Sequence, residues 1–127
     1  MGTALNMSED EYRVYLEATK KRMGKKQDIF QGELRERLME RVKRAAEHLK
    51  RKYGVKKVVL FGSLAHGALF DEFSDIDIAV EGIGEAEYWL AWKDIEEIVR
   101  DYAVDLVDIL TASDSLKRYI KEKGIEI

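Results

Sequence analysis

The sequence predicts an α/β (α+β) domain in which helices pack on a small sheet and a long helical arm precedes it. Residues 58–61 are a short apolar run, residues 76–80 place isoleucine and valine at the two-residue period of a strand, and residues 103–110 form a third, largely apolar strand-like stretch. The stretches before, between and after these runs carry apolar residues three and four positions apart, which indicates helices. A charged fraction of 37% and the absence of proline suit long helices with many surface ion pairs.

The helical arm is expected to begin at Ser8, because Ser8 and Glu11 have the spacing of a capping box. Gly24 and Gly32 each cost about 1 kcal/mol inside a helix, so we expect a break or bend between these two glycines. The part after it, residues 33–52, is expected to pack on the sheet. The part before it is expected to project toward a partner or to form a homo-oligomer contact through the N-terminal helices.

The length of 127 residues fits one domain and leaves no room for a separate substrate-binding domain. We expect residues 1–52 to form the helical arm and the first core helix, and residues 53–127 to form the rest of the core. No apolar run approaches the roughly 18 residues of a membrane span, and the first ten residues lack a signal-peptide core. A cytoplasmic protein without a membrane partner is expected.

Charge is divided unevenly along the chain. Residues 1–57 hold 16 Lys and Arg against 9 Asp and Glu, a net charge of +7, whereas residues 58–127 hold 6 against 16, a net charge of −10. The basic part could bind nucleic acid or an acidic partner, or it could be a solvated helix, which is the more common outcome. Nucleic acid is therefore not the expected partner.

The chemistry is concentrated in residues 58–80. Asp75 and Asp77 are two residues apart in a predicted strand, so their side chains point the same way, about 6 to 7 Å apart at the backbone. Carboxylate oxygens suit Mg²⁺, which takes further ligands from water and substrate phosphates. Gly62 and Ser63 offer a turn that a phosphate can approach closely, with a hydroxyl and a following helix start. A metal and phosphate site is predicted here.

Other kinds of metal site are excluded by composition. The chain has no cysteine, so disulfides and thiolate metal sites are absent, and His48 and His66 are its only histidines. A plain strand with one solvent-facing polar side would also place two aspartates at this spacing. That interpretation explains neither the preceding Gly-Ser turn nor a third acidic strand position further along the chain.

Gly62-Ser63, the eleven-residue spacer 64–74 and Asp75-Ile76-Asp77 resemble the signature of the DNA polymerase beta-like nucleotidyltransferase superfamily, in which Gly-Ser precedes Asp-x-Asp by about ten residues. The wider stretch of residues 61–80 is most similar to the minimal nucleotidyltransferase branch, many of whose members are antitoxins of HEPN-domain toxins. The resemblance implies a polymerase beta-like fold with a small mixed sheet, helices packed on one face and the helical arm before it.

The resemblance also implies a metal site. Two Mg²⁺ ions would be held by catalytic Asp75 and Asp77 and by a third carboxylate in a Val-Asp-Leu-Val-like strand, which matches Asp105. Strand alternation allows either Asp105 or Asp108 on the metal face, but not both. Asp108, nearer the predicted strand end, is therefore expected to be solvated or to cap a turn.

A nucleoside triphosphate is the implied second ligand. Gly62 and Ser63 would bind its phosphates, and His66 stands where the family commonly has arginine, next to the same phosphates. The implied activity is transfer of AMP from ATP to a tyrosine hydroxyl of a HEPN-domain toxin, which would be the protein partner. Neutralisation of that partner by binding alone, and nucleotidyl transfer to a small molecule or an RNA, are the alternatives.

Two further features have an ordinary and a functional interpretation. Arg41 and His48 have the Arg-x₆-His spacing of the HEPN ribonuclease motif, although Arg44 and His48 are also an ordinary pair on one helix face. Trp89 and Trp92 could stack on a nucleotide base, but aromatic residues at helical spacing more often belong to the core, and we expect the core here.

Overall fold

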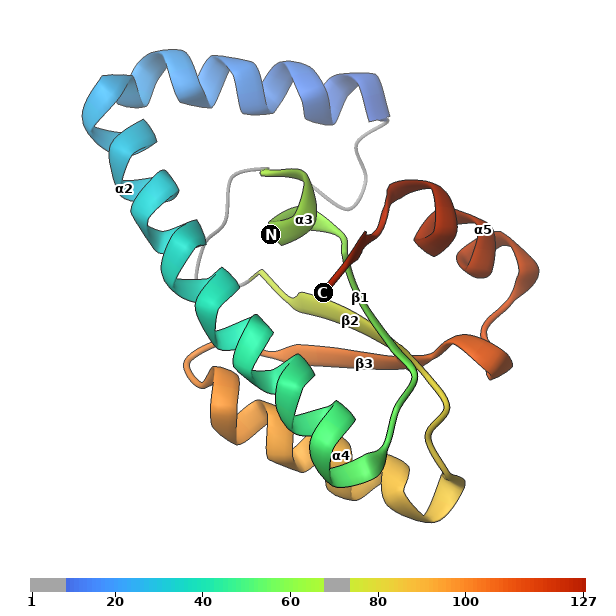
Figure 1. Ribbon diagram of the computed structural model, residues 1–127. Coiled ribbons are helices and arrows are strands. Elements are labelled where there is room, and N and C mark those ends of the chain that lie inside the picture. Colours follow the sequence, from blue (N-terminus) through green and yellow to red (C-terminus); the bar gives the residue numbers. More distant parts are fainter. Residues whose placement is uncertain (1–8, 68–73) are drawn as a thin grey trace. The chain divides into compact units, whose positions relative to one another are not determined.

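The computed structural model describes the backbone of residues 9–67 and 74–127 and the side chains of residues 31–67 and 74–127 (Figure 1). It contains two compact units, Met1–Leu34 and Arg35–Ile127. None of the described helices is both long enough and apolar enough to cross a membrane.

The first unit contains the beginning of helix α2 (Glu9–Tyr53). The helix starts directly after Ser8, as predicted from the capping box. Helical structure continues without a break through both Gly24 and Gly32, so the glycines do not end it. Their cost of about 1 kcal/mol each is small beside the cooperative propagation of a 45-residue helix. The expected partner or homo-oligomer contact of the arm depends on side chains outside the described residues.

The second unit follows the predicted order of strands and helices. Its further elements are β1 (Lys57–Phe61), α3 (Ser63–His66), β2 (Ile76–Glu81), α4 (Glu85–Val99), β3 (Val104–Asp108), the 3-10 turn η1 (Ile109–Thr111), α5 (Asp114–Lys123) and β4 (Ile125–Glu126). The sheet order is β3-β2-β1-β4. β1 is antiparallel to β2 and β4, whereas β2 and β3 are parallel. The predicted mixed sheet is confirmed.

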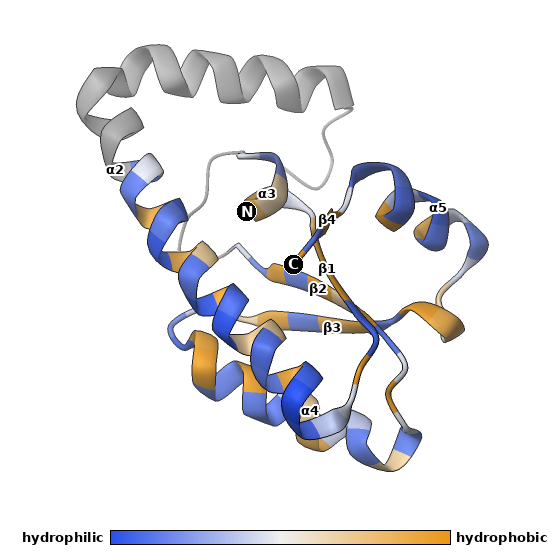
Figure 2. Cartoon of the chain, in the orientation of Figure 1, coloured by the Kyte–Doolittle hydropathy of each residue, from blue (hydrophilic) through white to orange (hydrophobic). Residues whose placement is uncertain are grey.

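One face of the sheet carries the main core. Every second strand residue is fully buried on this face, and the helices add a second apolar layer (Figure 2). The strand residues are Val58, Leu60, Ile76, Ile78, Val80 and Leu106, and the helix residues are Leu38, Val42 and Leu49 of α2 and Ala91, Ile95 and Val99 of α4. The part of α2 in this unit and α4 therefore cover one face, as predicted.

The opposite face is covered in part by α5. Ile120 packs against Val59, Phe61 and Ala79, with Leu116 beside them. Ser113 caps the N-terminus of α5, since its side-chain oxygen accepts from the Leu116 amide at 3.2 Å. The expectation that the helices pack on one face of the sheet is therefore wrong for α5. Because α5 packs on this second face, helices lie on both sides of the sheet.

Candidate active site

The strand register brings Asp77 and Asp105 together. Asp77 lies opposite Phe61 of β1 and is also the parallel partner of Asp105 on β3. Paired positions on neighbouring strands point to the same face, so both carboxylates lie on the face that α5 covers only in part. Asp75 is exposed and directly precedes β2. The prediction that Asp77 and Asp105 share a face of the sheet therefore agrees with the observed register, and Asp75 lies just before the strand.

The carboxylates repel one another. Burial, followed by the charges of Asp105 and Asp75, raises the pKa of Asp77 from 3.8 to about 6. No Lys, Arg or His side chain in the described ranges forms an ion pair with Asp77. A bound cation would remove this repulsion, and hard oxygen donors are the ligands that Mg²⁺ takes.

The three aspartates do not form a closed metal centre by themselves. Across residues 31–67 and 74–127, no three Asp, Glu, His or Cys side chains converge closely enough to hold a metal ion. An open set of carboxylates fits Mg²⁺, which usually keeps several waters and completes its coordination with phosphate oxygens of the substrate. The donor chemistry therefore fits a metal that arrives with its nucleotide.

Gly62 touches the central carboxylate. Its backbone has a φ of 80°, and a Cβ placed on it would lie 2.2 Å from Oδ2 of Asp77. Any larger residue would collide with the carboxylate and would also be strained at this φ. The glycine of the Gly-Ser turn thus allows the backbone that starts α3 to lie directly against Asp77, and any phosphate bound by the turn would be next to the aspartates.

Arg35 supports this turn from α2. Its Nε donates to the carbonyl oxygen of Leu64 at 3.0 Å, and its Nη2 donates to that of Ala65 at 3.4 Å. These carbonyls belong to α3, which has only four residues and cannot satisfy them internally. Sequence reasoning missed this contact because nothing in the local pattern links residues 29 and 30 positions apart.

His66 is exposed at the end of α3 and contacts α5. The Tyr119 hydroxyl lies 3.3 Å from Nε2 of His66, and the two rings meet edge to face with centroids 6.3 Å apart. Tyr119 also packs edge to face on Phe61, the last residue of β1. Sequence analysis considered His66 alone, and the helical pattern of α5 gave no signal for Tyr119. Residues 68–73 of the spacer lie outside the described residues.

β3 ends at Asp108, two residues earlier than predicted. The Asp108 side chain accepts from the Leu110 amide at 3.0 Å and so caps η1. The prediction that Asp108 would cap a turn is confirmed. The main-chain carbonyl of Leu106, on the free edge of β3, accepts from the Tyr88 hydroxyl. Burial, and after it the charges of Asp105 and Asp108, raise the pKa of Tyr88.

The tryptophans differ from the prediction in part. Trp89 is 70% exposed, so the expectation that it belongs to the core is wrong. Trp92 is half-buried, and its Nε1 donates to the Val104 carbonyl at 2.9 Å. The reason is the sheet order: β3 is an edge strand, and this side of α4 extends past it. Helical spacing alone cannot show where a sheet ends.

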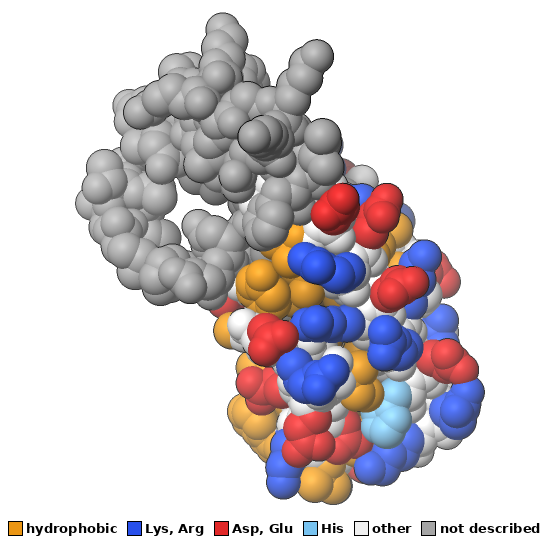
Figure 3. All heavy atoms as spheres, turned by 90° about the vertical axis from the view of Figure 1, so that its left-hand side faces the viewer, with side chains coloured by type: hydrophobic (Ala, Val, Ile, Leu, Met, Phe, Trp, Pro, Cys, Tyr) orange, Lys and Arg blue, Asp and Glu red, His pale blue; other side chains and the backbone are white. Residues whose placement is uncertain are grey.

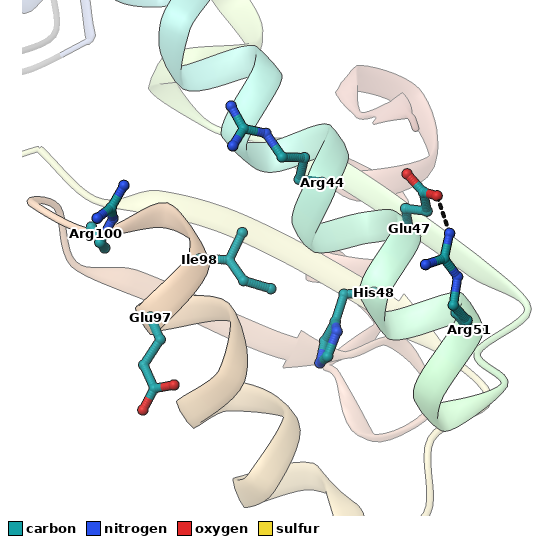
Figure 4. A pocket seen from close by; sticks show the side chains of 7 residues that line it. All are labelled: Arg44, Glu47, His48, Arg51, Glu97, Ile98 and Arg100. Atoms are coloured by element: carbon teal, nitrogen blue, oxygen red, sulfur yellow. Dashed lines mark hydrogen bonds and ion pairs between the residues drawn. The ribbon is translucent and has the colours of Figure 1, made fainter.

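A pocket of about 470 Å³ lies apart from these residues, between α2 and α4 (Figure 4). It is lined by Arg44, Glu47, His48, Arg51, Glu97, Ile98 and Arg100, and therefore by none of the predicted site residues. His48 and Ile98 point into the gap between the helices, whereas Glu97 points away from it. The arginines and glutamates are mixed, and Arg51 pairs with Glu47.

Arg41 and His48, which have the Arg-x₆-His spacing, make separate contacts with α4 and the residues after it. Arg41 donates to the Val99 carbonyl at 3.0 Å and pairs with Asp101 at 3.2 Å, which holds the end of α4. His48 lies 2.9 Å from Asp94. Hydrogen bonds from His48 and from the neighbouring tyrosine lower the pKa of Asp94. Arg41 and His48 therefore each join α2 to α4 in the core.

A mixed sheet with a Gly-Ser turn set against paired strand carboxylates has the features of a nucleotidyltransferase. The family profile described as "Polymerase beta, Nucleotidyltransferase" matches residues 40–127. The chain belongs to this family. No match was found among curated proteins.

Solved structures agree with this assignment. A chain from a toxin-antitoxin structure with AMP-PNP is 28% identical, with a TM-score of 0.56, over 65% of this chain and 69% of that chain. A chain from a mutant of the MntA-HpeT toxin-antitoxin is also 28% identical, with a TM-score of 0.56, over 67% and 70%. A chain from the MntA-HepT toxin-antitoxin, 24% identical with a TM-score of 0.54 over 69% of both chains, shows the same fold.

Proposed function

We propose that the chain is a Mg²⁺-dependent nucleotidyltransferase that transfers AMP from ATP to a hydroxyl group of a protein partner, and that it acts as the antitoxin of a HEPN-domain toxin. The observation that carries the proposal is the contact between Gly62 and the Asp77 carboxylate. It sets the Gly-Ser turn, our proposed phosphate binder, against the aspartates that we propose as metal ligands. The similarity to chains of toxin-antitoxin structures, one of them with AMP-PNP, supports the choice of donor and partner.

Each residue has a role in this chemistry. Asp75, Asp77 and Asp105 would hold two Mg²⁺ ions, which supply positive charge to the phosphates and lower the pKa of an acceptor hydroxyl. The turn at Gly62 and Ser63 donates backbone and hydroxyl hydrogen bonds to phosphate oxygens, and His66 approaches the same phosphates.

ATP, the acceptor hydroxyl and Asp105 account for every bond and proton of the transfer. The acceptor oxygen attacks the α-phosphorus, Asp105 accepts the hydroxyl proton, and the bond to the β-phosphate oxygen breaks so that pyrophosphate leaves. The reaction uses ATP and Mg²⁺ at cytoplasmic levels, and we place the protein in the cytoplasm.

The direct test is mass spectrometry of the protein encoded by the adjacent gene after incubation with this chain, ATP and Mg²⁺. We expect the partner to gain the mass of one or more AMP groups on tyrosine. The double variant Asp75→Asn with Asp77→Asn should transfer none. Asp108→Asn is the matched control, because an asparagine can still cap η1 and the residue lies on the other face. No added mass with the wild-type chain would refute the proposal.

A second candidate function is neutralisation by binding alone. It is supported by the similarity to chains of toxin-antitoxin structures, which concerns a bound partner and not a reaction. On the face drawn in Figure 3, Lys and Arg side chains are interspersed with Asp and Glu side chains. If the double aspartate variant protects cells from the toxin as well as the wild type does, binding is the protective activity.

A further inference from the structure

An exposed group of aromatic side chains lies at the free edge of β3. We call Tyr88, Trp89 and Trp92 of α4 the aromatic ledge. Trp89 is 70% exposed, which is unusual for the side chain with the largest apolar surface. So much exposed apolar surface on one side chain is a feature of surfaces that bind a partner.

The ledge is held rigidly. The Trp89 and Trp92 rings are stacked, with centroids 5.5 Å apart and an interplanar angle of 6°, and Tyr88 meets both rings edge to face at 5.1 and 5.7 Å. Trp92 and Tyr88 are anchored to carbonyls of β3 by their hydrogen bonds. These bonds use acceptors that an added strand would need, so the ledge disfavours strand pairing at this edge. Trp92 covers one face of the Trp89 indole, and the ring presents its other side outward.

One end of the ledge lies at the strand that carries Asp105. The Tyr88 hydroxyl donates to the carbonyl of Leu106, the residue next to Asp105 in β3, and the charges of Asp105 and Asp108 act on that hydroxyl. On α4, Glu85 lies one turn before Trp89, Lys93 one turn after it and Glu96 one turn after Trp92, and all three are exposed. With Asp105 and Asp108 on the adjoining strand β3, the border of the ledge carries more acidic than basic side chains, and we call it the acidic border.

We propose that the aromatic ledge is the docking surface for the acceptor protein, and that it takes a segment carrying arginine or lysine next to the hydroxyl to be modified. The proposal rests on the proposed function. A cation binds over an indole face, and the planar guanidinium of arginine also stacks on it. The acidic border attracts the same positive charge and repels an acidic segment. Rigid tryptophans at the centre of a contact commonly supply most of its binding energy.

The chain offers a specific signal for this interaction. Its only two tryptophans are Trp89 and Trp92, so tryptophan fluorescence reports on the ledge alone. Titration of the full chain with the tryptophan-free form of the adjacent gene's product, without ATP, should quench or shift the emission. As simple probes, the peptide Gly-Arg-Tyr-Arg-Gly should change the emission at concentrations where Gly-Glu-Tyr-Glu-Gly does not. Equal responses to the two peptides would overturn the charge preference.

Substitutions locate the contact. Trp89→Ala should weaken binding of the partner, measured by calorimetry, at least about thirty-fold, which corresponds to about 2 kcal/mol. The affinity for ATP with Mg²⁺ should change less than two-fold. Leu90→Ala is the matched control: Leu90 is 58% exposed on the same helix but points about 100° away, and its loss should leave both affinities unchanged. Thermal unfolding checks that both variants fold.

Three outcomes decide the matter. Partner affinity that falls only with Trp89→Ala supports the ledge as the docking surface. Unchanged partner affinity overturns it. A loss of ATP affinity with unchanged partner affinity also overturns it and assigns the ledge to the nucleotide base. Failure of the proposed function is read separately, because a wild-type chain that binds its partner through the ledge but transfers no AMP would refute only the catalytic proposal.

Discussion

Replacement of Asp77 by asparagine should stabilise the metal-free protein at neutral pH. The carboxylate is half-buried between two other negative charges, and its pKa is raised from 3.8 to about 6. The difference of about two pKa units corresponds to about 3 kcal/mol at 1.36 kcal/mol per unit. Because water reaches part of the side chain, we reduce this to about 1 to 2 kcal/mol.

The pH dependence gives the sign of the effect. The folded state holds a proton on Asp77 more tightly than the unfolded state does. Protonation of Asp77 therefore contributes fully to the stability of the fold below pH 3.8, and this contribution is lost as the pH rises through about 6. Asp77→Asn removes the charge and should therefore stabilise the protein above pH 6 and have little effect near pH 4. For a chain of 127 residues, 1 kcal/mol changes the Tm by about 4 °C.

The difference in Tm between the wild type and Asp77→Asn is measured at pH 4 and pH 7.5 by thermal unfolding, followed by circular dichroism with a chelator present. Mg²⁺ should then raise the Tm of the wild type and leave the Asp77→Asn variant almost unchanged, since the cation removes the repulsion that the substitution has already removed. Asp108→Asn, on the other face, should show no such gain. A Tm of Asp77→Asn at or below the wild-type value at pH 7.5 would refute the reasoning.

Three further predictions concern the surroundings of the site. Gly62→Ala should abolish AMP transfer and ATP binding, because the alanine Cβ would displace the Asp77 carboxylate. Calorimetry measures the affinity for ATP. An unchanged affinity would contradict the close contact between residue 62 and Asp77. Arg35→Ala should raise the KM for ATP more than it lowers kcat, because Arg35 holds the Gly-Ser turn, and Arg35→Lys should restore part of the affinity. Steady-state kinetics measure both constants. A larger loss in kcat than in KM would contradict this role of Arg35. Asp94→Ala should destabilise the protein by about 1 to 3 kcal/mol, because it leaves the partly buried His48 and Tyr53 without their common acceptor. Chemical denaturation measures that loss, which should shrink as the pH falls below 3.8, since the pKa of Asp94 is lowered in the folded state and its contribution fades in acid.

The parts of the site that could be predicted from sequence are those fixed by local periodicity. Alternation on a strand predicts that Asp75 and Asp77 lie on one side and that only one of Asp105 and Asp108 can join them. The family resemblance selects Asp105, which the register pairs with Asp77. The Gly-Ser turn could be assigned to phosphate from its residue types. These features depend on neighbours one or two positions away, where chain geometry leaves little freedom.

The remaining parts depend on which elements meet in space. Arg35 reaches α3 across about thirty residues, and Tyr119 meets His66 across 53. The exposure of Trp89 depends on β3 being the last strand on that side of the sheet, which no pattern within α4 reports. Sequence periodicity identifies an apolar face but does not say whether anything covers it.

The Gly-Ser turn and the aspartates form one unit for a physical reason that the sequence spacing alone does not give. Gly62 allows the backbone to touch Asp77, and this closeness buries the carboxylate enough to raise its pKa. The cluster of Asp75, Asp77 and Asp105 is therefore strained electrostatically without a bound cation. The same contact that would bring phosphate to metal also makes the metal-free protein less stable. Gain in stability with loss of transfer in Asp77→Asn would demonstrate that the two properties have one cause.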